Sequence, residues 1–329
     1  MGVQTAVAEV ALAERCIEIA MKFLVILICL AMNILWLKDF NRFDDSWFFR
    51  LYRTVNQAFS SAEEGSWLRD FAPILIIYSM PLLLLALLLT ILKGAVFSLP
   101  LMLLHVLVLL FALDRTQPGS MAQEFLKRWR EGDNEACLNY LSIEFRLSPE
   151  QKLKDEAAIC AFFRERLIYQ CFEKMFVMLF WYLVAGPLGV LICYISYQLR
   201  DSVNEHQTIS ENKIVINSLR VLKWVPLRLL SITFALAGNF VNCFDLLKQS
   251  FWSMDEAGAS SHLVSYANSA LAYDQGLVSE GKVGTQTWRI AQETQIEKVR
   301  ALLERSQIIW LTVLALITLI SPLWLVWNG

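Results

Sequence analysis

Two long apolar blocks stand almost back to back in this chain, and they limit the fold more than any other feature. Residues 73–92 and 95–113 contain no Asp, Glu, Lys or Arg, and only Lys93 and Gly94 separate them. A bilayer core about 30 Å thick is crossed by roughly 20 helical residues, since each residue adds about 1.5 Å. The sequence therefore predicts a tight hairpin of two membrane helices.

Further apolar blocks extend this prediction to a polytopic membrane protein. Residues 175–198 and 308–327 are long enough to cross a bilayer, and residues 23–37 form a shorter block. The chain is 56% hydrophobic and only 18% charged, outside the usual range of soluble domains. We predict an all-α membrane protein with five to six membrane-embedded helices and a helical cytoplasmic portion.

The polar residues are concentrated in one long segment, residues 114–174. We interpret residues 21–329 as a single membrane domain that carries this segment as a helical insert. Ser148 and Pro149 have the residue types of a helix cap and first position, so they predict the start of the helix that continues into the next apolar block. Residues 1–20 resemble no secretory signal, and we interpret them as an upstream start-site extension.

Common catalytic and metal-binding motifs are missing from the sequence. It contains no HExxH, GxSxG, Walker A or GxGxxG pattern, only three histidines, and seven cysteines without a CxxC pair. A net charge of −2 gives no reason to expect nucleic acid. We therefore predict no catalytic residue, no metal site and no cofactor.

A short set of polar side chains precedes the block 175–198. Glu165, Tyr169 and Glu173 are spaced by four residues, so an α-helix places them on one face, with Gln170 beside them. Two carboxylates there could hold Mg²⁺. Alternatively, they pair with neighbouring basic side chains on a solvated helix, and this second interpretation is favoured.

The segment that contains Trp224, Pro226 and Arg228 opens another apolar run. Proline is well tolerated at the first position of a helix, because its missing N–H would have no partner there. We therefore predict a short helix that starts near residue 225. Arginine in its first turn is unfavourable next to the positive helix end, and near a membrane it needs a partner or water. Arg228 is accordingly a candidate functional residue.

Several of these segments together resemble the AmpE family. The resemblance rests on residues 180–189, which include Gly186 and Pro187, and on residues 223–229, 234–238 and 301–311. It implies a multi-pass protein of the bacterial inner membrane, linked with the amidase AmpD to β-lactamase induction and cell-wall recycling. The implied partners are the lipid bilayer and a membrane or cytoplasmic protein. Gly186, Pro187 and Pro226 are expected to have structural roles.

AmpE proteins in turn resemble the CobD/CbiB amide synthases, which use ATP. The resemblance places Glu165, Gln170 and Glu173 at acidic or amide positions of those synthases, but Tyr169 replaces a glutamate. Leu219 and Arg220 stand in place of paired aspartates, and Lys223 in place of asparagine. A further Asn-Thr-Leu-Asp motif of the synthases is replaced by residues 197–200.

Because of these departures from the amide synthases, we do not expect ATP-dependent amide synthesis. A regulatory protein that is not an enzyme is favoured. The alternative is a membrane enzyme with a substituted site that acts on a phosphorylated or lipid-linked substrate. The residues that could bind such an anion are Arg228, Arg220, Lys223 and Trp224.

Overall fold

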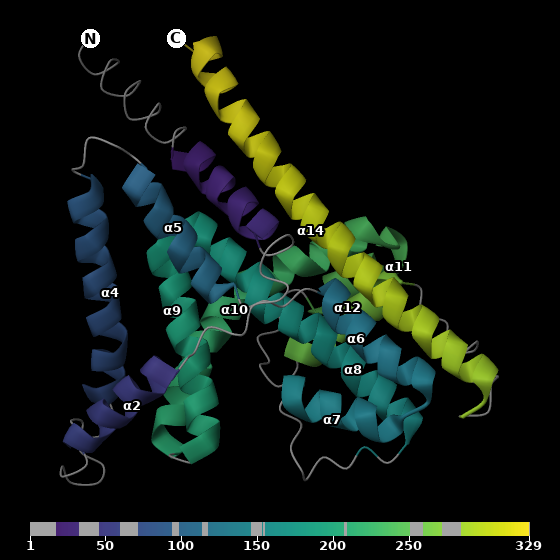
Figure 1. The fold of residues 1–329 in the computed structure, drawn as a ribbon. Helices are drawn as coiled ribbons and strands as arrows, with labels where there is room; N and C mark the ends of the chain where they lie inside the picture. The colour runs from purple at the N-terminus through teal and green to yellow at the C-terminus, as the bar shows by residue number, and fades with distance from the viewer. Residues whose placement is uncertain are drawn as a thin grey trace. The chain divides into compact units, whose positions relative to one another are not determined.

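The computed structural model confirms the all-helical prediction (Figure 1). No strand is found among the residues that it describes, which are 18–32, 46–59, 72–93, 99–113, 118–145, 153, 155–206, 209–250, 259–271 and 284–328. Three helical segments are long and apolar enough to cross a membrane, namely Ala72–Lys93, Glu156–Asp201 and Gln286–Thr318. The helix Leu99–Ala112 is apolar but shorter.

The chain divides into two compact units. Unit 1 comprises Met1–Arg115, Val177–Lys223 and Leu314–Gly329, and unit 2 comprises Thr116–Phe176 and Trp224–Val313. Each unit is described by itself below.

Unit 1 is built around three neighbouring apolar helices, α4 (Ala72–Lys93), α5 (Leu99–Ala112) and α9 (Met178–His206) (Figure 1). The short helix α2 (Ser46–Phe59) packs on α4, and its Trp47 ring stacks on Tyr194 of α9. An unlabelled helix over residues 18–32 contacts α5, where the Cys29 thiol donates to the Val106 carbonyl. Exposed leucines and isoleucines cover the outer side of α4, as expected for a helix surrounded by lipid.

Helix α9 has a sharp corner near its start. Gly186 has φ 63° and ψ −150°, a backbone conformation that is strongly unfavourable for residues other than glycine. Three residues later, a Cβ atom on Gly189 would lie 2.6 Å from the carbonyl oxygen of Trp181. Both positions therefore favour glycine, Gly186 because of its backbone conformation and Gly189 because the chain passes too close to leave room for a side chain.

Proline residues leave two helix carbonyls without their usual partner, and side chains replace the missing donors. Pro187 cannot donate to the carbonyl of Leu183, four residues earlier, and Lys22 Nζ lies 3.3 Å from that oxygen. Pro226 cannot donate to the carbonyl of Leu222, which accepts instead from Trp181 Nε1 at 2.9 Å.

This replacement explains why the predicted start of one helix was wrong. Helix α10 runs from Ile209 to Ala237, so Pro226 and Arg228 lie inside it and not in its first turn. The preference of proline for the first helical position, where its missing N–H would have no partner, predicts a helix start at Pro226. Here the indole of Trp181 satisfies the carbonyl that would otherwise be exposed, and the helix continues.

The helix that leads into α9 also starts later than predicted. Helix α8 spans Glu156–Cys171, and its N-cap is Asp155, whose carboxylate accepts from the Ala158 N–H at 2.7 Å. The predicted cap, Ser148, lies outside the described residues. Between α8 and α9 the helix widens into a π-helical segment, η2 (Phe172–Val177).

Unit 2 has an aromatic core between helices α6 (Pro118–Glu131), α7 (Asn134–Phe145) and α8. The rings of Phe125 and Phe163 stack with their centroids 3.9 Å apart, and Trp129 is almost fully buried beside them. Burial of the Cys137 thiol in this core raises its pKa to about 11.

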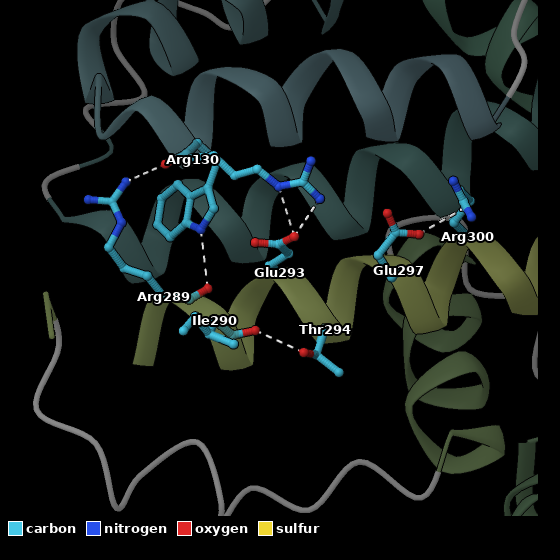
Figure 2. A network of polar contacts seen from close by, with 8 residues as sticks. Arg130, Arg289, Ile290, Glu293, Thr294, Glu297 and Arg300 are labelled. Atoms are coloured by element: carbon cyan, nitrogen blue, oxygen red, sulfur yellow. Dashed lines mark hydrogen bonds and ion pairs between the residues drawn. The ribbon is translucent and has the colours of Figure 1, made fainter. Parts of the chain in front are cut away.

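The long helix α14 (Gln286–Asn328) packs on this core through paired polar contacts (Figure 2). Arg289 bonds Glu156 at 3.0 Å and the Trp129 carbonyl at 2.6 Å, and Arg130 bonds Glu293 at 2.9 Å. The Glu293 carboxylate raises the pKa of Arg130.

The contacts of α14 also fix its direction relative to α8. Arg289 meets Glu156 at the start of α8, and further along both helices Trp310 meets Phe176, with ring centroids 5.2 Å apart. The two helices therefore run in parallel. Both become apolar near the Phe176–Trp310 contact, which marks the level where α14 changes from charged to apolar sequence.

Two shorter helices, α11 (Phe240–Ser250) and α12 (Ala259–Ala270), complete unit 2. The Asn239 N–H donates to the Ala270 carbonyl at 2.8 Å, and the Cys243 thiol donates to the Tyr266 carbonyl. Since contacts at increasing positions in α11 involve decreasing positions in α12, the two helices are antiparallel.

Candidate functional site

The predicted site residues fall on two helical stretches. Glu165, Tyr169 and Gln170 belong to α8, and Glu173 belongs to η2. The remaining candidates lie on α10, and these are Arg220, Lys223, Trp224 and Arg228.

The four residues near the start of the membrane block differ in environment. Glu165 is exposed, Tyr169 and Gln170 are half-buried, and Glu173 is only 7% exposed. The predicted common face assumed α-helical spacing throughout, whereas the π-helical segment begins at Phe172 and changes the angle between successive side chains. Within the described part of the chain, no three His, Cys, Asp or Glu side chains gather in a way that could hold a metal ion.

Three residues of unit 1 form what we call the Tyr197 cluster, namely Tyr197 and Arg200 on α9 and Lys223 on α10. The Arg200 guanidinium lies 5.1 Å from the centroid of the Tyr197 ring, and the Lys223 ammonium lies 5.3 Å from it. Lys223 is only 5% exposed. Asp201 pairs with Arg200 at 3.1 Å. The negative face of an aromatic ring attracts cations, so the Tyr197 ring favours both positive groups at this position.

This cluster joins two segments that the resemblance to the amide synthases identified separately. Residues 197–200 and Lys223 both replace polar or acidic residues expected from the resemblance to the amide synthases, and the structure brings them to one ring. Arg220 precedes Lys223 by one helical turn and is exposed. The local arrangement is therefore basic and aromatic.

Arg228 lies in unit 2, where its guanidinium is 5.7 Å from the centroid of the Trp224 ring. It is only 6% exposed, and Tyr266 of α12 lies within range of an electrostatic interaction. The nearby hydroxyls of Ser231 and Thr233 donate back to carbonyls of the same helix, at 2.8 and 2.7 Å. Arg228 is thus buried inside the unit beside the Trp224 ring.

Reasoning from the sequence missed the residues that support this arrangement. Trp181 and Lys22 donate to carbonyls that lack a backbone donor because of proline. The Tyr197 ring contacts two cations. The proline positions did carry a usable signal, because each interior proline predicts one carbonyl, four residues earlier, that needs a donor.

Taken together, the apolar helices of unit 1, the ion-paired helices of unit 2 and the basic–aromatic cluster define a helical membrane protein without an evident catalytic constellation among the residues described. Residues 21–275 match the family described as "Regulatory signalling modulator protein AmpE". The chain therefore belongs to the AmpE family. Neither a curated protein nor a solved structure matches the chain.

Proposed function

We propose that this protein is a multi-pass regulator of the bacterial inner membrane that takes part in β-lactamase induction and cell-wall recycling, and that it does not carry out ATP-dependent amide synthesis. Family membership supports a regulatory role. The Tyr197 cluster is the observation that carries the second part of the proposal.

The argument from the cluster is electrostatic. A magnesium–nucleotide site needs oxygen ligands, usually carboxylates, to hold the metal beside the phosphates. At the positions where the resemblance implies acidic or amide residues, this chain has Arg200 and Lys223, and both contact the Tyr197 ring. The two cations outnumber the one carboxylate that pairs with Arg200, Asp201, so the cluster is unfavourable for Mg²⁺ and supports a function other than metal-dependent synthesis.

A deletion strain of a bacterium with an inducible β-lactamase tests the regulatory role. We expect deletion of the gene to change β-lactamase activity after exposure to an inducing β-lactam, and the wild-type gene to restore it. The Lys223→Met variant should restore induction poorly although it reaches the membrane in normal amount. Arg130→Gln, which removes an exposed cation of unit 2, is the matched control and should restore it fully. Unchanged induction in the deletion strain would refute the regulatory role.

The second candidate is a membrane enzyme that acts on a phosphorylated or lipid-linked substrate. It is favoured by the presence of Arg200 and Lys223 at one aromatic ring, because cationic side chains suit a phosphate group. Thermal unfolding of the purified protein with Mg-ATP, nucleotide-linked cell-wall precursors and corrinoids distinguishes the two. Stabilisation by one of these compounds that is lost in Lys223→Met and kept in Arg130→Gln would favour the enzyme.

A further inference from the structure

The end of α10 and the start of α11 form an apolar surface outside the three helical segments that are long and apolar enough to cross a membrane. Residues 229–244 contain no Asp, Glu, Lys or Arg. Six large side chains in this stretch are exposed, from 37% for Ile232 to 76% for Val241. We call them the hairpin surface, which consists of Leu229, Ile232, Leu236, Phe240, Val241 and Phe244.

The chain turns between the α10 residues and the α11 residues of this surface. Asn239 and Cys243 of the second arm contact Ala270 and Tyr266 of α12 in antiparallel order, while Arg228 of the first arm lies near Tyr266. The chain therefore turns back on itself between Ala237 and Phe240. A Cβ atom on Gly238 would lie 2.4 Å from the Ala270 carbonyl oxygen, so the turn is tightly packed.

The position of the hairpin surface within unit 2 indicates what covers it. Thr233 accepts a hydrogen bond from Trp310 Nε1 at 3.0 Å. Trp310 lies where α14 changes from charged to apolar sequence, just after the exposed Ile308 and beside Phe176. Tryptophan is common at the level where a helix enters the bilayer. The hairpin surface thus begins at the same level as the apolar face of α14.

We propose that the hairpin surface contacts lipid acyl chains, so that the second half of α10 and the first turns of α11 are embedded in the bilayer. Six exposed large apolar side chains within sixteen residues are unusual for a surface that faces water. In the α10 arm of this stretch, the Ser231 and Thr233 hydroxyls are bonded to helix carbonyls, whereas Asn239 and Asn242, at the turn and the start of α11, are exposed. Internal bonding such as that of the two hydroxyls is required of a segment in lipid. This proposal does not depend on the proposed function.

Carbene labelling from within the bilayer tests the proposal on the unmodified protein. The protein is reconstituted in nanodiscs that contain a phospholipid with a diazirine on its acyl chain, irradiated, digested and mapped by mass spectrometry. We expect peptides covering the hairpin surface to be labelled about as strongly as those of α4, and several-fold more than the peptide containing Ile143, an exposed isoleucine of α7. Labelling at the Ile143 level would overturn the proposal, whether water or a second copy of the chain covers the surface.

A pair of variants gives an independent measurement. Val241→Asp places a charge in the first turn of α11, where the helix dipole would stabilise it in water. Ile143→Asp places one near the end of α7, where the dipole is unfavourable. If lipid covers Val241, Val241→Asp should nevertheless lower the yield of folded membrane protein several-fold, and Ile143→Asp should not. The opposite order would show that water surrounds Val241.

Discussion

The two units satisfy their buried polar groups by different means. In unit 1, hydrogen bonds between neutral groups serve this purpose. Trp181 Nε1 donates to the Leu222 carbonyl, and His105 Nδ1 and the Tyr182 hydroxyl share a hydrogen bond of 3.0 Å. In unit 2, charged pairs join the helices, such as Arg289 with Glu156. The ion pairs of α6, α8 and the start of α14 fit a surface near water, where an ion pair loses little, whereas a freed carbonyl in lipid needs an internal donor.

Each unit also has a glycine at a position where a side chain has no room. Gly189→Ala in unit 1 and Gly238→Ala in unit 2 bring a methyl group within 2.6 and 2.4 Å of a backbone carbonyl oxygen. We expect each to lower the free energy of unfolding by about 3 kcal/mol. Thermal and denaturant unfolding in detergent measure this change.

Gly119→Ala is the control for this pair. Its added methyl would meet only the end of the flexible Glu304 side chain, at 3.3 Å, so stability should change little. Equal losses for all three variants would show that the close contacts at Gly189 and Gly238 do not decide the result.

The next largest effect tests whether a side-chain donor really replaces the hydrogen bond that Pro226 lacks. Trp181→Phe removes the donor to the Leu222 carbonyl and should cost about 2 kcal/mol of unfolding free energy. In a Pro226→Ala background the backbone N–H returns, so the same change should cost clearly less. A double-mutant cycle of unfolding free energies measures the coupling. Equal costs in both backgrounds would contradict the role given to Trp181.

Ion pairs of unit 2 should contribute according to their burial. Arg289 is 22% exposed and bonds both Glu156 and the Trp129 carbonyl, so Arg289→Gln should cost about 1.5 kcal/mol. The Arg130 side chain is 58% exposed, so Arg130→Gln should cost less than about 1 kcal/mol. Denaturant unfolding of the two variants at low and high salt provides the measurement, and a larger loss for Arg130→Gln would reverse the ranking.

The smallest effect appears only at high pH. Burial raises the pKa of the Cys137 thiol from 9.0 to about 11, so the folded protein keeps this proton more tightly than the unfolded chain. Its contribution to stability is therefore fully present below pH 9 and is lost as the pH rises toward about 11. Unfolding curves of wild type and Cys137→Ala should diverge in slope over this range, and parallel curves would show that the thiol is not protected by the core.

The apolar blocks were sufficient to predict an all-helical membrane protein, because bilayer thickness sets the length of a helix that crosses it. They could not predict the extent of α10, since its continuity through Pro226 depends on a donor from Trp181, far away in the sequence. The Tyr197 cluster could likewise not be predicted from the sequence, because it joins the end of α9 to the middle of α10. Local patterns give the elements, whereas contacts distant in sequence decide how interrupted helices continue.

The prediction for Glu173 shows a second reason for failure. Counting by four from Glu165 assumes one helix type, and the π-helical segment Phe172–Val177 breaks that assumption without any proline or glycine within it. Glu173 is buried while Glu165 is exposed. The residue types of this segment do not by themselves predict a π-helix.

That π-helical segment also has an evolutionary consequence. A π turn holds one residue more than the α turn it replaces, so it behaves as a one-residue insertion retained within a helix. A homologue whose helix is α throughout should be one residue shorter between Phe172 and Val177. Aligning such sequences without a gap would shift every residue of the following helix by about 100° around its axis, and would assign lipid-facing positions to the core.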